Sequence, residues 1–477
     1  MLKYKIILII ILSGLYTTPL ESQDKKVFIH FMGWYGEGRY GNHWKDGTAH
    51  EPLIGYYSSK SWAAQLYQIL LSWRCGIDGL VLNLNDSYDK ESMGVLLNTY
   101  QRLSSVNQDF SYDFAISYDD QGFNSPEDAI SKFTELRDNT LPKISYLRYN
   151  DSPVLFIYNY PDDYLDSKDY KKTADSIFTE NGAFLVWNEL DVAANEDMDA
   201  IYPWVKGFSS DGSEWGSDYL NWFYNSAPLK TNLDLVVGGV WPGFDDRDCY
   251  WGKNRWINRN YGQVYRDTWG LVNSYNRSLP MDWVYIETWN DWNEGTEIEP
   301  SVEHGTFYLQ QTVDYINTFK ESSLHIGTLD FEALSLLYEA ARMIEKGQRD
   351  SVEFYPVLEV AIEQIMDLNS EGAIVSLNEI LTGIEMKHRE NFLNPMLCYF
   401  DVVNSILYIC NNNSSKEAVL LEIYDVHGRM IEQTFKVNLQ GGFEQSIDLS
   451  YFSQGVYIAS LKSRYGRKSI KILVPGN

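Results

Sequence analysis

One short segment of the chain combines acidic and aromatic side chains in a way that could do chemistry. It holds four carboxylates and two tryptophans in the order Trp289-Asn290-Asp291-Trp292-Asn293-Glu294-Gly295-Thr296-Glu297-Ile298-Glu299-Pro300. Asp291 and Glu294 are three residues apart, so one helical turn would put both on the same side. Two carboxyl groups that face one glycosidic bond are the minimum machinery for its hydrolysis, one protonated to assist the leaving group and one ionised.

The aromatic neighbours of these carboxyl groups would help to keep them in different protonation states. Apolar rings such as Trp289 and Trp292 would raise one pKa, and a second negative charge nearby would push the two pKa values apart. The same residues could instead hold Ca²⁺ or cap a helix, and their spacing alone leaves that alternative open.

Polar side chains also stand where other apolar runs end. These are His30, Asn83, Asn85, Asp86, Asp119, Asp120, Asn159, Asn188, Glu189, Asp211, Asp245, Asp246, Glu287 and Asn290. Carboxylates, amides and Trp without Cys or Ser–His pairs suit a neutral polyhydroxylated ligand, whose hydroxyls pair with the polar groups and whose C–H faces stack on rings. Gly-rich phosphate loops and dinucleotide fingerprints are missing, and the spacing of His30, His43 and His50 fits no compact metal-ligand pattern. We therefore expect no cofactor and no catalytic metal, while a structural Ca²⁺ stays open.

The elements that must position these residues alternate between apolar strands and amphipathic helices. The expected strands are Val27–Met32, Ile77–Asn83, Tyr112–Tyr118, Val154–Asn159, Ala183–Trp187, Ile201–Phe208, Leu235–Val240 and Trp283–Trp289. Their continuous apolar character indicates a parallel sheet covered on both faces. Eight such units predict an α/β fold, a (β/α)8 TIM barrel over residues 23–325, with its site at the carboxyl ends of the strands. A doubly wound sheet is the alternative.

The other parts of the chain have different patterns. A basic start and a short apolar run in residues 1–22 are typical of a secretory signal peptide. Helical spacing of apolar residues predicts a helical linker or hairpin over 326–390. Residues 391–477 alternate short strands with Gly, Asn and Ser turns, which predicts an Ig-like β-sandwich. The strands expected there are Ile406–Cys410, Val419–Tyr424, Phe443–Leu449, Val456–Leu461 and Ser469–Leu473.

Composition narrows the range of partners. The chain has 66 acidic and 39 basic residues, a formal net charge of −27. Nucleic acid and anionic lipid both recruit Lys and Arg, so this balance argues against either as partner. All 15 Trp lie between Trp34 and Trp292, which concentrates sugar-stacking rings in the predicted barrel. The oligomeric state is left unpredicted.

Several motifs between Val27 and Phe319 resemble those of glycoside hydrolase family 99, and more distantly family 71. The segment of Asp291 and Glu294 is similar to the family's NEWxEGTxIEP motif. Five further stretches are similar to HYMxW, HW, PLIGxYxS, GIDG and PGYDDT in that order, namely His30-Phe31-Met32-Gly33-Trp34, His43-Trp44, Pro52-Leu53-Ile54-Gly55-Tyr56-Tyr57-Ser58-Ser59, Gly76-Ile77-Asp78-Gly79 and Pro242-Gly243-Phe244-Asp245-Asp246.

This resemblance implies roles for the matching residues. Glu294 matches the general acid that then becomes the base. Asp291 matches a Glu that removes the proton from the neighbouring 2-hydroxyl, a route through a 1,2-anhydro sugar with overall retention; Asp is one methylene shorter. With the strand-end positions added, the candidate substrate-binding residues are Trp34, His43, Trp44, Tyr56, Tyr57, Asp119, Asp245, Glu287, Trp289, Asn290 and Trp292. For Glu287, strand alternation could equally direct the side chain into the barrel interior. For Trp34, His43, Trp44, Tyr56 and Tyr57 the alternative is packing under a long loop.

The end of the chain resembles the C-terminal sorting domain of type IX secretion substrates of Gram-negative bacteria. Leu421-Glu422-Ile423-Tyr424-Asp425-Val426-His427-Gly428-Arg429 is similar to its IYDxxGR turn, and Ile447-Asp448-Leu449-Ser450 with Gly455-Val456-Tyr457-Ile458 to its IDLSxLxxGVYxL segment. The resemblance implies secretion machinery as a partner, and a secreted or cell-surface location. An ordinary carbohydrate-binding or spacer sandwich is the alternative.

These patterns lead to one hypothesis with two rivals. The hypothesis is a secreted, endo-acting glycoside hydrolase of α-linked polysaccharide, with α-mannan or another mannose-containing glycan as first substrate. One rival is a family 71-like α-1,3-glucanase. The other is a non-catalytic glycan-binding protein on the same barrel, which Asp in place of Glu at position 291 favours.

Overall fold

The computed structural model describes residues 25–474 with several gaps. The gaps are residues 86, 120–124, 159–166, 189–196, 230–232, 280, 382–395, 402–405, 412–416, 426–428, 440–443, 450, 454 and 464–465. The predicted signal peptide and four strand-end residues named above (Asp86, Asp120, Asn159 and Glu189) lie outside the described residues.

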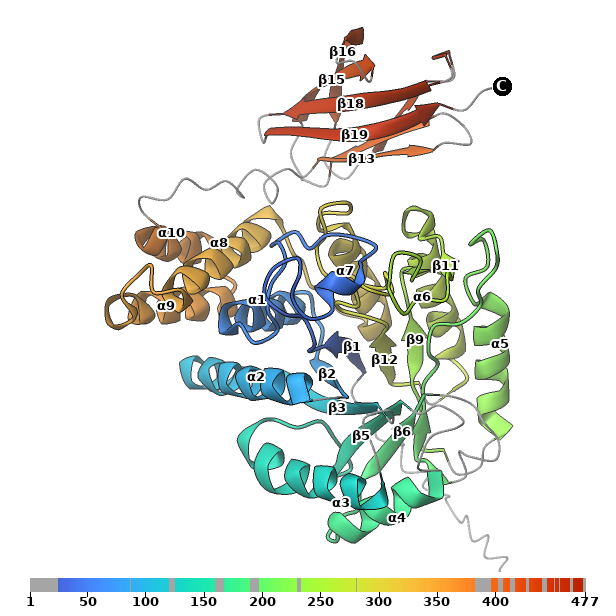
Figure 1. The fold of residues 1–477 in the computed structure, drawn as a ribbon, viewed down its shortest axis with the longest axis vertical. Helices are drawn as coiled ribbons and strands as arrows, with labels where there is room; N and C mark the ends of the chain where they lie inside the picture. The colour runs from blue at the N-terminus through green and yellow to red at the C-terminus, as the bar shows by residue number, and fades with distance from the viewer. Residues whose placement is uncertain are drawn as a thin grey trace, which may run out of the picture.

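A parallel sheet forms the centre of the larger part of the chain (Figure 1). Its strands are β1 (Lys26–Met32), β2 (Gly79–Leu84), β3 (Asp113–Asp119), β5 (Ser152–Tyr158), β6 (Phe184–Trp187), β7 (Ala200–Ile201), β8 (Leu235–Val236), β9 (Gly238–Val240) and β12 (Trp283–Ile286). Their order is β8-β7-β6-β5-β3-β2-β1-β12-β9. β8 pairs with β7, and β9 pairs with β12. Only Val237 separates β8 from β9 along the chain, so the two ends of the sheet meet and the sheet closes into a barrel. This closure excludes the doubly wound alternative.

The strand predicted at Ile201–Phe208 is much longer than the observed β7. Pro203 follows β7 and lacks the N–H that a strand ladder needs. The proline also packs so tightly on β9 that a Cβ at Gly239 would lie 2.5 Å from Pro203 Cγ. The rest of the predicted strand is therefore a loop at the carboxyl end of the barrel.

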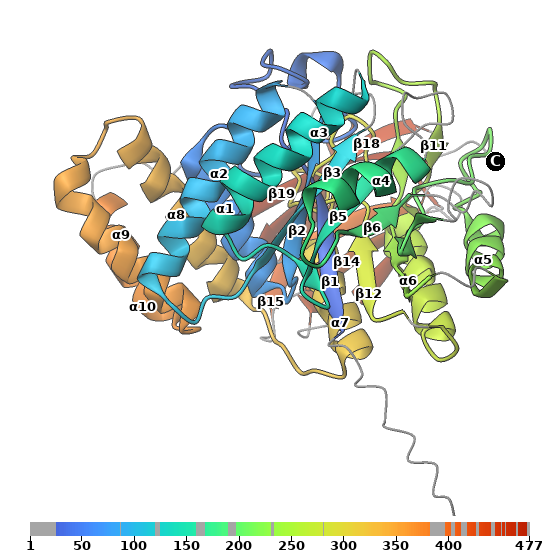
Figure 2. The same cartoon turned by 90° about the horizontal axis from the view of Figure 1, so that it is seen from below.

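Helices surround the barrel, as the sequence predicts (Figure 2). They are α1 (Trp62–Arg74), α2 (Ser87–Val106), α3 (Pro126–Glu135), α4 (Ser167–Ile177), α5 (Ser217–Ser226), α6 (Gln263–Tyr275) and α7 (Phe307–Lys320). Helix α1 shows why they form: Ser61 caps its first turn by accepting from the Ala64 N–H, and Leu66, Ile69 and Leu70 bury one apolar face.

Three more helices pack against the side of the barrel at α1. They are α8 (Thr328–Glu345), α9 (Ser351–Met366) and α10 (Ser370–Leu381). The Glu345 carboxylate accepts from the Ser61 hydroxyl at 2.7 Å and from the Trp62 N–H at 2.8 Å, which covers the N-terminus of α1. Arg74 at the other end of α1 pairs with Asp330 at 3.0 Å. The predicted helical segment is thus a small bundle fixed to the barrel.

The C-terminal part consists of antiparallel strands. They are β13 (Met396–Asp401), β14 (Ile406–Asn411), β15 (Glu417–Asp425), β16 (Met430–Leu439), β17 (Glu444–Asp448), β18 (Gly455–Ser463) and β19 (Gly466–Val474). They form two sheets, β13-β14-β17 and β16-β15-β18-β19, whose buried apolar residues make one cluster. All five predicted strands are present; β13 and β16 were missed.

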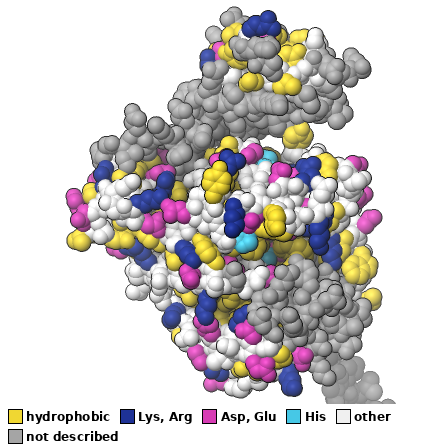
Figure 3. All heavy atoms as spheres, in the orientation of Figure 1, with side chains coloured by type: hydrophobic (Ala, Val, Ile, Leu, Met, Phe, Trp, Pro, Cys, Tyr) yellow, Lys and Arg dark blue, Asp and Glu magenta, His cyan; other side chains and the backbone are white. Residues whose placement is uncertain are grey.

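The surface of the described residues carries both signs of charge. On the face in Figure 3, Lys and Arg are interspersed with Asp and Glu over the barrel. Among these residues no helix is both long and apolar enough to cross a membrane.

Candidate active site

A cleft of roughly 670 Å³ opens at the carboxyl ends of the barrel strands, where a barrel of this kind carries its site. The strands β1, β2, β3 and β5 contribute to it directly, and long loops supply the rest. The described residues that line it are His30, Met32, Trp34, His43, Asn83, Asn85, Asp89, Asp119, Tyr158, Trp204, Val205, Lys206, Phe208, Trp251, Lys253, Arg255, Asp291 and Glu294.

Asp291 and Glu294 lie on a tight turn after β12 and line this cleft. Asp291 Oδ1 accepts a hydrogen bond from the Glu294 backbone N–H at 2.9 Å, and Thr288 Oγ1 accepts one from the Asp291 N–H at 2.8 Å. Gly295 continues the turn with φ +60°, and a Cβ there would lie 2.9 Å from the Ala49 Cβ. The turn therefore fixes both carboxyl groups relative to the same stretch of backbone.

The two carboxyl groups have different electrostatic surroundings. Burial raises the pKa of both. Backbone N–H donors and the nearby His30 oppose that rise in the pKa of Asp291. The negative charge of Asp291 raises the pKa of Glu294 further, although Arg255, with Nη2 3.6 Å from Glu294 Oε1, opposes it. Asp291 therefore ionises before Glu294, the division that an acid and a base require.

A buried polar chain lies beneath this pair. His30 Nδ1 is 2.8 Å from Glu287 Oε2, and His30 Nε2 is 3.3 Å from Asn83 Oδ1. Burial raises the pKa of Glu287, and His30 opposes the rise. Glu287 was predicted to contact substrate, but it has no exposed surface and is not among the described residues that line the cleft. It supports His30 from the barrel interior instead.

Four aromatic residues predicted to line sugar subsites are buried under the loop. They are Trp44, Tyr57, Trp289 and Trp292, each at most 3% exposed. Trp44 stacks on Tyr35 at 3.9 Å, and its Nε1 donates to the Tyr57 carbonyl at 2.7 Å. Their large rings fill the space between the β1–α1 loop and the carboxylate loop, so they pack under the loop and are not among the described residues that line the cleft.

Three further predicted contacts are also absent from the described cleft lining. The Asn290 amide is buried and binds the N–H and carbonyl of Met32 at 2.7 and 3.0 Å. Asp245 turns away to pair with Arg247 at 2.6 Å, although its backbone N–H donates to the Glu294 carbonyl. Tyr56 lines a separate hollow against α8. Asn290 and Asp245 therefore shape the loop and are not among the described residues that line the cleft.

The predicted residues Trp34, His43 and Asp119 do line the cleft. The Trp34 ring lies 5.1 Å from His43, which in turn contacts the Trp251 ring edge to face at 5.2 Å. These rings form an aromatic wall of the kind that sugars stack against.

Sequence reasoning missed a second set of lining residues. They are Tyr158, Trp204, Lys206, Phe208, Trp251, Lys253 and Arg255. Trp204 and Lys206 lie in the loop that replaces the end of the predicted Ile201–Phe208 strand, so a correct strand end would have identified them. Trp251, Lys253 and Arg255 belong to a long excursion after β9, where no periodic pattern relates a residue to the barrel mouth.

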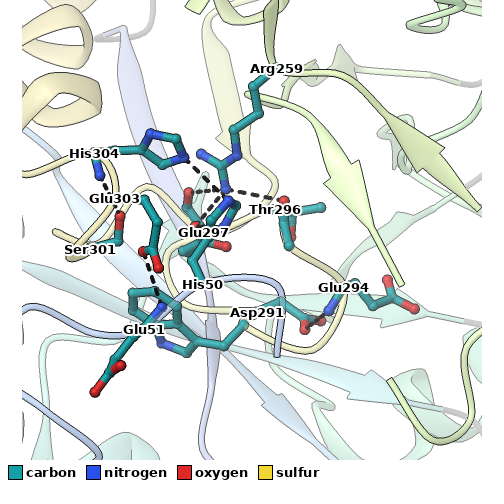
Figure 4. A network of polar contacts seen from close by, with 12 residues as sticks. His50, Glu51, Arg259, Asp291, Glu294, Thr296, Glu297, Ser301, Glu303 and His304 are labelled. Atoms are coloured by element: carbon teal, nitrogen blue, oxygen red, sulfur yellow. Dashed lines mark hydrogen bonds and ion pairs between the residues drawn. The ribbon is translucent and has the colours of Figure 1, made fainter. Parts of the chain in front are cut away.

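Figure 4 shows what anchors the carboxylate loop on its other side. His50 and Arg259 converge on Glu297, while Glu294 points away from them. Arg259 Nη2 donates to Glu297 Oε1 at 2.6 Å and to the Gly295 carbonyl at 3.1 Å, and His50 Nδ1 lies 2.8 Å from Glu297 Oε1. His304 Nε2 lies 3.3 Å from His50 Nε2 and extends the chain of contacts.

The fourth carboxylate of the segment is equally enclosed. Glu299 accepts from the Tyr57 hydroxyl at 2.7 Å and from Gln68 Nε2 at 3.2 Å, and burial raises its pKa to about 8. Glu297 and Glu299 therefore hold the loop, and only Asp291 and Glu294 are presented to the cleft.

A metal site is not visible in the part of the chain that the structure describes. No three His, Cys, Asp or Glu side chains come close enough together there to hold an ion. His30 and His43 line the cleft, but His50 lies in the anchoring network.

The structure thus combines a closed barrel with a Trp-lined cleft and two carboxyl groups at the strand ends. Comparison with solved structures agrees on the fold. The GH99 endo-α-mannosidase of Bacteroides thetaiotaomicron matches 62% of this chain and 98% of its own, with a TM-score of 0.52 and 17% identity. The predicted resemblance to family 99 is confirmed at the level of the fold.

Curated relatives match a shorter stretch. A glycoprotein endo-α-1,2-mannosidase-like protein of Danio rerio is 30% identical over 110 residues, and the glycoprotein endo-α-1,2-mannosidase of Rattus norvegicus is 28% identical over the same length. The match spans 23% of this chain and 23% and 22% of those proteins.

The C-terminal part matches a family of its own. Residues 403–475 match the secretion system C-terminal sorting domain. The predicted sorting domain is confirmed, and it indicates export to the cell surface or beyond.

Proposed function

We propose that this protein is a secreted glycoside hydrolase that cleaves α-linked polysaccharide in the manner of an endo-α-mannosidase. The observation that carries the proposal is the pair Asp291 and Glu294. Both line one cleft, and their surroundings favour an ionised Asp291 beside a protonated Glu294. The fold shared with endo-α-mannosidases supports it.

In the first step, Asp291 removes the proton of the 2-hydroxyl of the sugar being cleaved. The 2-oxygen attacks C1 of the same sugar, and the bond from C1 to the leaving oxygen breaks. Glu294 gives its proton to that leaving oxygen. The product is a 1,2-anhydro sugar, and no bond forms between sugar and protein.

In the second step, the ionised Glu294 acts as base. It takes a proton from water, whose oxygen attacks C1 and opens the three-membered ring. The 2-oxygen recovers its proton from Asp291. Two inversions at C1 give overall retention of configuration, and both carboxyl groups return to their initial protonation states.

The lining of the cleft suits a sugar chain. Trp34 and Trp251 line the cleft with rings of the kind that stack on the C–H faces of sugars, and the Asp119 carboxylate can accept hydrogen bonds from sugar hydroxyls. His43 contacts both the Trp34 ring and the Trp251 ring, and these contacts hold the aromatic wall in place before substrate binds.

The remainder of the chain fits export of this catalytic unit. We assign residues 1–22 to a signal peptide, 23–325 to the barrel, 326–390 to the helical linker and 391–477 to an Ig-like sorting domain. The sorting domain would engage the type IX machinery of a Gram-negative bacterium, with the barrel as cargo.

Hydrolysis by the full chain tests the proposal. Wild type and Glu294→Gln are incubated with α-mannan and α-1,3-glucan, and released oligosaccharides are analysed for linkage. We expect α-mannan products from wild type and almost none from Glu294→Gln. Full activity in Glu294→Gln overturns the assignment, and products from α-1,3-glucan alone decide for a family 71-like glucanase.

One observation favours a second candidate, a non-catalytic glycan-binding protein. Asp291 is only 3% exposed and one of its oxygens is held by the Glu294 N–H, which limits the reach of its short side chain. Binding of α-mannan without any released product decides for this candidate.

A further inference from the structure

Basic side chains collect in one sector of the cleft, although acidic residues outnumber them in the whole chain. Lys206 follows β7, and Lys253 and Arg255 lie in the excursion after β9. β7 pairs with β8, and β8 runs into β9, so these segments are neighbours around the barrel. On the outer face in Figure 3 the two signs of charge are interspersed. The lining also includes Asp89, Asp119, Asp291 and Glu294, so the positive charge is confined to one sector, that of Lys206, Lys253 and Arg255.

Buried contacts hold the segment of Lys253 and Arg255 in place. Asp246, whose side chain is completely buried, accepts from Arg255 Nε at 2.7 Å and from the Lys253 backbone N–H at 3.1 Å. The Arg255 guanidinium lies 4.8 Å from the Phe244 ring centre and 4.9 Å from that of Phe208. A buried carboxylate and two rings thus hold the segment that carries both cations.

Asp246 pairs with Arg255, but a neutral sugar gives no reason for the two lysines beside it. Hydroxyl groups are served equally well by amides and carboxylates, which the cleft also offers. In addition, Arg255 and Lys253 both lower the pKa of Glu294, which weakens its hold on the proton that a general acid must keep. A negative group bound beside them would cancel this effect at the moment when substrate is present.

We propose that the glycan taken by this cleft carries an anionic substituent, which Lys206, Lys253 and Arg255 bind. A sulfate ester, a phosphate ester and a carboxylate share the required chemistry, because each presents several charged oxygens to ammonium and guanidinium donors. This inference rests on the proposed function and narrows its substrate from a neutral polysaccharide to an anionic one.

Matched substrates test this inference. The full chain is given α-mannan oligosaccharides that are neutral or carry one sulfate, one phosphate monoester or one C6 carboxylate. We expect kcat/KM to be about tenfold higher for at least one anionic form, and we expect added salt to reduce that preference. The three arms distinguish the source of the charge.

Variants then test whether the preference for anionic substrates depends on Lys253. Lys253→Met should reduce the ratio of kcat/KM between anionic and neutral substrates about fivefold, each enzyme being measured at its own optimal pH. Lys253→Arg should retain most of the ratio because it keeps the charge. The matched control is Lys90→Met, an exposed lysine on α2 that pairs with Glu135 and should leave the ratio unchanged.

The outcomes separate the inference from the proposed function. If Glu294-dependent hydrolysis is as fast on the neutral glycan as on all three anionic forms, the inference is overturned and the hydrolase stands. If no glycan is cleaved, the proposed hydrolase activity is wrong. Calorimetric binding of the same glycans then tests the inference. Tighter binding of an anionic form supports an anion-binding role of the sector, and equal binding of all forms overturns it.

Discussion

The two sides of the carboxylate loop use the same residue types for opposite purposes. On the cleft side, the charge of Asp291 acts on Glu294, and the Arg255 guanidinium lies 3.6 Å from Glu294. On the core side, Glu297 is held by Arg259 and His50, and Glu299 by Tyr57 and Gln68. The two pairs of acids differ in their partners, which leave Asp291 and Glu294 at the cleft and enclose Glu297 and Glu299 in the core.

The comparison predicts its largest effect for Glu294→Gln. Loss of the general acid should lower kcat/KM on α-mannan by about 10²- to 10⁴-fold, because the leaving oxygen no longer receives a proton. The thermal midpoint should stay near that of wild type, since Glu294 is partly exposed and not part of the anchoring network. A large drop in the midpoint would make Glu294 structural and break the distinction.

Glu297→Gln should show the opposite behaviour. It leaves the buried Arg259 without its carboxylate, which we expect to cost about 3 kcal/mol in the free energy of unfolding. Denaturant titration measures the loss, and kcat of the folded fraction should stay within about tenfold of wild type. The double variant Glu297→Gln with Arg259→Met is the control and should recover part of the stability. A variant as stable as wild type contradicts the anchoring role.

The same contrast extends to tryptophan and predicts a smaller effect. Trp251 is 40% exposed at the cleft, whereas Trp292 is fully buried. Trp251→Ala should raise KM about tenfold through lost stacking on the sugar while the thermal midpoint is preserved. Trp292→Phe, a milder change of a buried Trp, should lower the midpoint and leave KM of the folded protein unchanged. Equal KM values for both variants and wild type would remove Trp251 from the subsites.

The smallest predicted effect is a shift in the pH profile of activity, caused by the charge of Glu297 acting on the pKa of Asp291. The negative Glu297 raises the pKa of Asp291, so Glu297→Gln should lower that pKa. Activity requires ionised Asp291 and protonated Glu294, so kcat/KM rises through the first pKa and falls through the second. The acid limb of the pH profile should therefore move to lower pH while the alkaline limb stays. A shift of the acid limb to higher pH contradicts this coupling.

The fold could be predicted because apolar strands and amphipathic helices follow simple periods. The error at Ile201–Phe208 arose where an apolar run continued past Pro203, which ends the ladder. The position of Asp291 and Glu294 at the cleft could be predicted because their conspicuous segment directly follows a strand, and their catalytic role remains a prediction.

The residues that line the cleft were harder to predict for a physical reason. Trp is large and amphipathic, and its ring serves equally well under a loop or beside a sugar, so Trp44, Trp289 and Trp292 could not be separated from Trp34 by sequence. The sector of Lys206, Lys253 and Arg255 depends on a long excursion whose path is set by the buried Asp246. No local pattern encodes that path.

The division of labour between Asp291 and Glu294 can be measured directly with a substrate whose leaving group departs without a proton. We compare wild type, Glu294→Gln and Asp291→Asn on α-mannan and on an α-mannobiosyl fluoride. The account predicts that Glu294→Gln loses far less activity on the fluoride than on the polysaccharide, whereas Asp291→Asn loses activity equally on both. An equal loss on both substrates for Glu294→Gln would contradict its role as the acid.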